Sequence, residues 1–162
     1  EKFMDRGLSV LFVLAISLCA FPLSAKDQYA GYYYPNPVTK EAYRSRIRTL
    51  SEASREARMA FVTSITNNII RKNSYPPQFT VYLKGSRQQK LIIVGLRDGS
   101  YNTIFRARAL MAQLKTGVST KRVMREKVKT NHLTFLDLLK SMGFEQLTIS
   151  DGKVFSHQIN IR

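Results

Sequence analysis

The chain has 162 residues, which is enough for one ordinary domain with a packed core. Its 26 Lys and Arg residues outnumber its 11 Asp and Glu residues, and the formal net charge is +15. A field of that sign repels cations and attracts polyanions, anionic lipid headgroups or acidic proteins. The alternative is that the basic residues form a solvated surface that only keeps the protein soluble. The single cysteine excludes a framework of intrachain disulfides.

The first 25 residues have the order of a secretory signal peptide. Arg6 precedes an apolar run over 7–21, and the small-residue exit at 22–25 ends in Ala25. We expect Met4 to be the initiator and cleavage near Ala25 to release a periplasmic or secreted product. The run is shorter than the roughly 20 apolar residues of a membrane span, and an uncleaved anchor is the alternative. The released chain would lack Cys19 and would therefore contain no thiol.

Residues 26–50 are expected to form a Tyr- and Pro-rich arm followed by a first strand. Two prolines and a glycine exclude regular helix over 29–37. A tyrosine has an apolar ring and a polar tip, so the arm either fills a groove of its own domain or contacts a partner. The predicted partner contacts are Tyr32, Tyr33 and Tyr34.

The pattern over 41–50 alternates, which predicts a strand with arginines on one face. Ser51 is the predicted N-cap of a helix that runs to about Lys72, before two prolines. Residues 79–84 alternate as a half-buried strand, and residues 91–94 are apolar throughout, as in a strand covered on both sides.

A helix is predicted over 102–115, followed by a weakly patterned basic span over 116–130. Thr134 and Asp137 have the spacing of a capping box at the start of the next helix, and Gly143 is placed to end it.

A final hairpin turns around residues 150–152, and we choose the register that buries the larger apolar set. This register places Leu147, Ile149 and Ile159 on one face, together with His157 opposite Glu145. The predicted fold of 51–162 is one α+β domain, with a mainly antiparallel sheet of four to five strands packed with about three helices.

Four stretches resemble a family of small exported alphaproteobacterial proteins, and the likeness covers nearly the whole mature chain. They are Tyr32-Tyr33-Tyr34-Pro35, residues 90–96, residues 106–110 and residues 133–152. Members often carry the name molybdopterin-guanine dinucleotide biosynthesis protein A, which implies a cytoplasmic nucleotidyltransferase with a glycine-rich loop. This chain has no such phosphate loop and no acidic cluster for magnesium and a nucleotide. The resemblance therefore implies an exported α+β protein, and no catalytic residue is carried over.

No catalytic, metal or cofactor motif is present in the sequence. His132 and His157 are the only histidines, and neither has a partner at metal-ligand spacing. We interpret His132 as a solvated loop residue and His157 as part of a structural pair with a glutamate. An enzyme of unrecognised type, with a pocket near His157, is the alternative.

The basic residues are the stronger candidates, because guanidinium and ammonium groups neutralise phosphates and carboxylates. The predicted anion-binding residues are Arg44, Arg46, Arg48, Lys121, Arg122, Arg125, Lys127 and Lys129. The leading hypothesis is a non-enzymatic exported protein that binds an acidic protein, an envelope polymer or a lipid headgroup. We expect no nucleic-acid ligand, because export separates the protein from nucleic acid. A membrane-anchored accessory subunit of an envelope complex is a further alternative.

Overall fold

The computed structural model of the chain describes residues 36–72, 77–119 and 132–162, all within one compact unit, Tyr34–Arg162. Three sets of sequence predictions lie outside the described residues. They are the signal segment 1–25, the tyrosines Tyr32 to Tyr34 and the basic residues Lys121 to Lys129.

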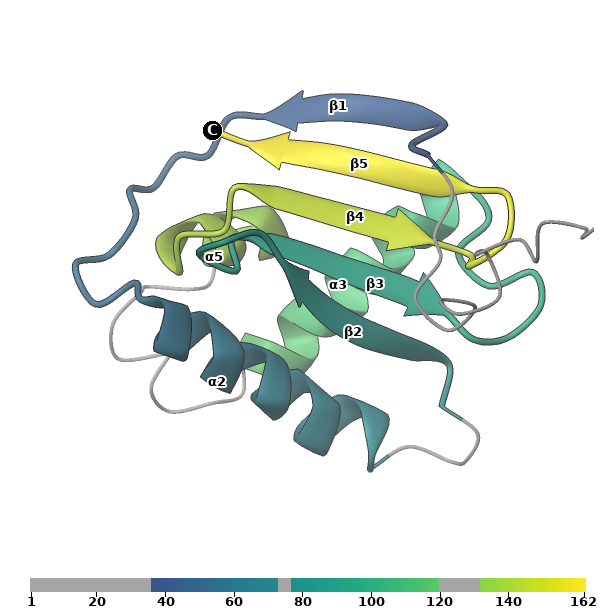
Figure 1. Cartoon of the computed structure of the whole chain (residues 1–162), viewed down its shortest axis with the longest axis horizontal. Helices are drawn as coiled ribbons and strands as arrows, with labels where there is room; N and C mark the ends of the chain where they lie inside the picture. The colour runs from purple at the N-terminus through teal and green to yellow at the C-terminus, as the bar shows by residue number, and fades with distance from the viewer. Residues whose placement is uncertain (1–35, 73–76, 120–131) are drawn as a thin grey trace, which may run out of the picture. The chain divides into compact units, whose positions relative to one another are not determined.

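A five-stranded mixed sheet forms one layer of the domain (Figure 1). Its strands are β1 (Thr39–Tyr43), β2 (Phe79–Lys84), β3 (Lys90–Gly95), β4 (Gln146–Ser150) and β5 (Ser156–Ile161), in the order β1-β5-β4-β3-β2. The predicted α+β class is confirmed. The sheet is less antiparallel than predicted, because β1 runs parallel to β5 and β3 runs parallel to β4. A parallel neighbour needs a long crossover connection, and helices supply it between β3 and β4.

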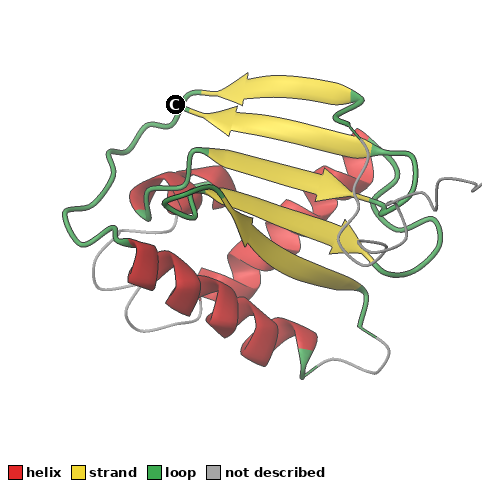
Figure 2. Cartoon of the chain, in the orientation of Figure 1, coloured by secondary structure: helices red, strands yellow, loops and turns green. Residues whose placement is uncertain are grey.

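The helices α2 (Arg55–Ile65), α3 (Ile104–Ser119) and α5 (Phe135–Ser141) form a second layer (Figure 2). A π-helical segment, Thr66–Ile70, extends α2. The helix begins later than predicted, since Ser54 rather than Ser51 is the N-cap: Ser54 Oγ accepts a hydrogen bond from the Ala57 N–H at 3.1 Å. Residues 50–53 form a turn instead, in which the Ala53 N–H donates to the Leu50 carbonyl.

The hydrophobic core lies between the helix layer and one face of the sheet. Leu91, Ile93, Leu147, Ile149 and Ile159 point into it and are fully buried. Burial of each such side chain contributes about 1.5–3 kcal/mol. The prediction that 91–94 is buried on both faces holds for Ile92, which points away from this core and is only 3% exposed.

The β4–β5 hairpin has the predicted face but not the predicted register. His157 pairs with Ile149, not with Glu145, although it points into the core as expected. The loop is longer than a three-residue turn because Asp151 Oδ1 accepts hydrogen bonds from three successive backbone N–H groups, at 2.8, 3.0 and 2.9 Å. These bonds satisfy the loop backbone locally, and strand pairing resumes only at Ser156.

Strand β1 ends at Tyr43, seven residues earlier than the alternating pattern predicted. The buried Asp137 side chain draws the chain out of the sheet at this point: its Oδ1 accepts from the Ser45 hydroxyl at 2.7 Å and from the Arg46 N–H at 3.4 Å. The arginines of 44–48 therefore lie on an extended connection between β1 and α2.

Candidate functional site: a basic pocket at the start of helix α2

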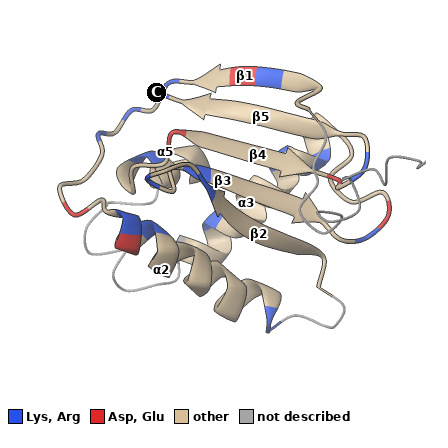
Figure 3. Cartoon of the chain, in the orientation of Figure 1, with Lys and Arg blue, Asp and Glu red and all other residues tan. Residues whose placement is uncertain are grey.

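The predicted basic residues that the structure describes lie on the surface. Arg44, Arg46 and Arg48 are all exposed on the connection from β1 to α2. Figure 3 shows that Lys and Arg positions also occupy the β2–β3 hairpin and the first turn of α2, at the same end of the sheet. Positive charge from several segments is therefore gathered at this end.

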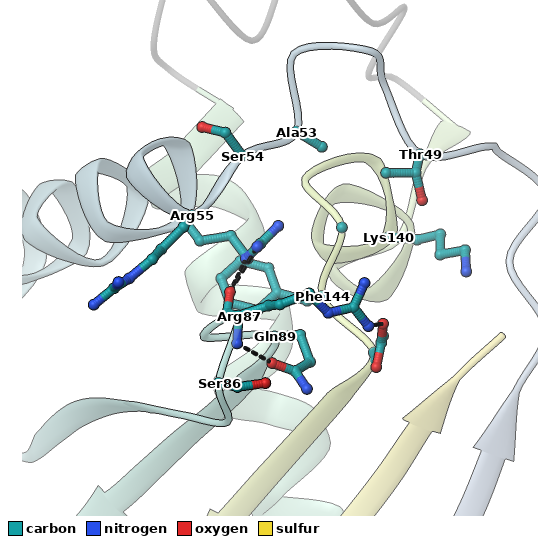
Figure 4. A pocket seen from close by; sticks show the side chains of 12 residues that line it. Thr49, Ala53, Ser54, Arg55, Ser86, Arg87, Gln89, Lys140 and Phe144 are labelled. Atoms are coloured by element: carbon teal, nitrogen blue, oxygen red, sulfur yellow. Dashed lines mark hydrogen bonds and ion pairs between the residues drawn. The ribbon is translucent and has the colours of Figure 1, made fainter.

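A cavity of about 470 Å³ lies at this end of the domain and is called here the basic pocket. The first turns of α2, the β2–β3 hairpin and the end of α5 form its walls (Figure 4). Four of its lining residues are basic and one is acidic: Arg55, Arg58, Arg87, Lys140 and Glu145. None of these residues was predicted as a site residue from the sequence.

Arg58 is the central residue of the pocket wall. It is only 6% exposed, and its Nε and Nη2 donate to the Arg87 carbonyl at 3.2 and 2.6 Å. Its Nη1 donates to the Met142 carbonyl at 3.1 Å. No carboxylate among the described residues lies within ion-pair distance of this guanidinium. A buried charge that meets only carbonyl oxygens is incompletely compensated, and a bound anion would supply the missing negative charge.

Gly143 makes room for Arg58. Its φ of +78° ends α5, and a Cβ at this position would lie 2.8 Å from Arg58 Nη1. The backbone N–H of Phe144 donates to the Leu139 carbonyl and closes the helix end. The sequence correctly predicted Gly143 as the helix terminator, but not this second requirement.

The β2–β3 hairpin places Arg87 at the mouth of the pocket. The Arg87 N–H donates to Gln89 Oε1 at 3.1 Å, and its guanidinium donates to Glu145 Oε1 at 2.7 Å. Both side chains of this ion pair are well exposed, so solvent weakens their attraction. Figure 4 shows Arg55 and Lys140 on opposite sides of Arg87, with their side chains reaching outward. These long side chains have the freedom to turn toward a ligand.

The N-terminus of α2 adds partial positive charge to the same place. Glu56 lies in the first turn of this helix. A hydrogen bond from its own backbone N–H, together with one from the Ser54 side chain, holds the pKa of the Glu56 carboxyl below its usual value. Negative charge is therefore stabilised next to the pocket.

The sequence contains an indication that Arg58 is buried, which the predictions above did not use. Arg58, Phe61 and Ile65 fall at helical spacing on one face of α2, and all three are buried. A charged residue on an apolar stripe needs specific partners, which is a stronger indication of a site than exposed arginines are.

His157, the predicted candidate for an enzyme, lies in the core beside β1. It is 1% exposed, its Nδ1 is hydrogen-bonded to Thr39 Oγ1 at 2.7 Å, and its Nε2 is 3.5 Å from Glu41 Oε1. The predicted histidine–glutamate pair thus exists with Glu41 and not with Glu145. Glu41, rather than His157, lines the neighbouring cavity. His132 is exposed, as expected.

Asp137 is a buried acid, and its contacts are structural. Burial would raise its pKa, but hydrogen bonds from the Thr134 backbone, Ser45, the Thr134 hydroxyl and Tyr43 outweigh that effect and hold the pKa below its usual value. Thr134 and Asp137 form the predicted capping box of α5. The acceptor positions of this carboxylate are therefore occupied by the domain's own donors.

Comparisons with protein-family models, curated proteins and solved structures give no match for this chain. In the part of the chain that the structure describes, no cluster of three or more histidine, cysteine or acidic residues is arranged to hold a metal. Across the same residues, no helix combines the length and apolar character that a membrane crossing requires.

Proposed function

We propose that the protein is an exported, non-enzymatic binding protein whose basic pocket holds a phosphate or carboxylate group of an anionic partner. The single observation that carries this proposal is Arg58, a buried guanidinium whose hydrogen-bond acceptors are backbone carbonyls. Arg55, Arg87 and Lys140 add charge around it, and Glu145 is the acid that lines the same pocket. Guanidinium groups favour phosphate and carboxylate because both present paired oxygens.

The exposed arginines of 44–48 contribute in a different way. They lie on the segment that leads to Thr49, which lines the pocket, so their field attracts an anionic partner toward it. An acidic protein, an envelope polymer or a lipid headgroup would bring such a group. The periplasmic location rests on the signal-like segment 1–25 and on the family resemblance, and it remains a proposal.

The binding test is calorimetric titration of inorganic phosphate, and separately of acetate, into the purified protein in a buffer that contains no other phosphate or carboxylate. We expect a saturable single-site isotherm for the wild type. The double variant Arg55→Gln/Lys140→Gln should bind at least tenfold more weakly, because it removes two cations at the pocket mouth and leaves the buried Arg58 contacts intact.

The matched control is Arg71→Gln/Lys72→Gln, which removes the same charge from exposed positions just beyond the other end of the α2 helical run. Its affinity should stay within twofold of the wild type. If the control loses as much affinity as the pocket variant, binding depends on net charge and the proposed site is wrong. Export is tested by sequencing the N-terminus of the natural product: a cytosolic chain that begins at Met4 would contradict it.

A further inference from the structure

Strand β1 is an edge of the sheet with backbone groups directed outward. It pairs with β5 on one side, and no described strand pairs with its other side. Toward β5, the Tyr43 carbonyl accepts a hydrogen bond from the Arg162 N–H at 2.8 Å. Because successive strand residues direct their N–H and C=O groups to alternate sides, Thr39 and Glu41 face β5 as Tyr43 does, and Lys40 and Ala42 direct their backbone groups away from β5. An extended segment could form backbone hydrogen bonds with these groups.

An apolar cavity of about 440 Å³ lies beside this edge, between β1, α3 and the start of α5. Met111, Ala112, Phe135 and Leu136 supply its apolar wall. Glu41 and Tyr43 of β1 line it from the sheet side, since they lie on the helix-facing side of the strand. The strand edge and the cavity together are called here the edge groove.

A cation lies at the edge groove. Arg108 Nη2 is 3.2 Å from Glu41 Oε2, and its side chain is 62% exposed, so it has room to bind a second carboxylate. Lys40, exposed on β1, adds another positive charge on the opposite face of the same strand. The groove thus combines an unpaired strand edge, an apolar cavity and positive charge.

We propose that the edge groove binds an extended peptide segment of a partner protein, which adds to β1 as a sixth strand. Side chains of an added strand alternate between the two faces, so one apolar side chain would enter the cavity beside Glu41. An acidic residue or a terminal carboxylate next to that side chain would meet Arg108. Backbone bonds would supply affinity, and the cavity with Arg108 would select the sequence.

This inference does not rest on the basic pocket. The pocket recognises an anionic group through Arg58 and the start of α2, whereas the edge groove recognises an extended backbone through β1 and α3. The pocket variant Arg55→Gln/Lys140→Gln should therefore bind peptides as the wild type does.

The test uses an immobilised library of eight-residue peptides with free or amidated C-termini, followed by titration of the most enriched peptide. We expect enrichment of one large apolar residue adjacent to an acidic residue or to the free C-terminus. Ala112→Phe should weaken binding at least tenfold, because the exposed Ala112 lines the cavity and a phenylalanine there would fill it. Ala109→Phe is the control, another exposed alanine on α3, which lies outside the lining of this cavity.

Arg108→Gln should weaken binding of the acidic peptide and leave binding of its neutral analogue unchanged. Amide exchange gives a second readout, since strand addition should slow exchange at Lys40 and Ala42 much more than at Thr39 and Glu41, whose N–H groups already face β5. The proposal is overturned if no peptide is enriched, if Ala109→Phe weakens binding as much as Ala112→Phe does, or if the Lys40 and Ala42 amides are unaffected by bound peptide.

Discussion

A Cβ at Gly143 would lie 2.8 Å from Nη1 of Arg58, closer than ordinary van der Waals contact allows. The glycine that ends α5 thus also forms the space for the buried guanidinium from α2. Arg58 in turn holds the β2–β3 hairpin and the end of α5 through the Arg87 and Met142 carbonyls. The packing of α2, the β2–β3 hairpin and the end of α5 therefore depends on the fit between Gly143 and Arg58.

Gly143→Ala should destabilise the domain more than Gly99→Ala. Both glycines have positive φ, +78° and +73°, so each alanine would cost about 1–2 kcal/mol in backbone strain. At Gly99 the nearest atom to an added Cβ is 3.6 Å away, so only Gly143→Ala also displaces a buried group. Urea unfolding measures the two losses, and equal losses would show that the Arg58 contact carries no extra cost.

Glu145→Gln should strengthen phosphate binding. Glu145 now accepts a hydrogen bond from the Arg87 guanidinium at 2.7 Å, and the amide would release the charge of Arg87 toward the pocket. We expect a three- to tenfold lower dissociation constant by calorimetry. Asp98→Asn makes the same change of net charge at an exposed ion pair with Lys153, and should leave the affinity unchanged. An equal gain from both variants would assign the effect to net charge.

Arg58→Met should both destabilise the domain and remove its response to phosphate. The substitution leaves the Arg87 and Met142 carbonyls without their donor, at a cost of about 1–3 kcal/mol. For the wild type, phosphate at a hundred times its dissociation constant should add about 2.7 kcal/mol to the free energy of unfolding. Thermal unfolding with and without phosphate measures both effects. A variant that phosphate stabilises as strongly as the wild type would exclude Arg58 from binding.

Asp137→Asn should lower stability at neutral pH and reduce the loss of stability in acid. The pKa of Asp137 is lowered in the folded state, so its contribution is present above the unfolded value, 3.8, and is lost as the pH falls through the folded value. Removing the charged acceptor should cost about 1.5–3 kcal/mol at pH 7.

The difference between wild type and Asp137→Asn should shrink below about pH 4. Chemical unfolding at a series of pH values gives the two curves. Parallel curves down to the lowest pH would mean that the carboxylate charge does not contribute, and only its geometry matters.

Local patterns predicted much of the fold, because residues close in sequence determine caps and strand faces. The capping box of Thr134 and Asp137, the glycine end at Gly143 and the core face of Ile149 and Ile159 were all predicted correctly. The early end of β1 was missed because it depends on Asp137, whose contact with Ser45 spans 92 residues. The hairpin register was missed because the Asp151 carboxylate accepts hydrogen bonds from the loop backbone, and these bonds lengthen the loop.

The candidate site was missed for the same physical reason. Arginines at 44, 46 and 48 are visible as a pattern, but exposed charge is abundant in a basic protein. Arg58 is a site candidate because it donates hydrogen bonds to two carbonyls that are distant in sequence. A periodic pattern of residues does not predict such long-range contacts. The position of Arg58 among Phe61 and Ile65 was the sole local indication.

The most direct test of the central claim is the location of bound phosphate, measured by backbone amide chemical shifts during a phosphate titration of isotope-labelled protein. We predict saturable shifts confined to the basic pocket, at Thr49, Ser54, Ser86 and Gly143. Shifts that do not saturate, or that centre on the exposed arginines of 44–48 without the pocket amides, would contradict an anion site built around Arg58.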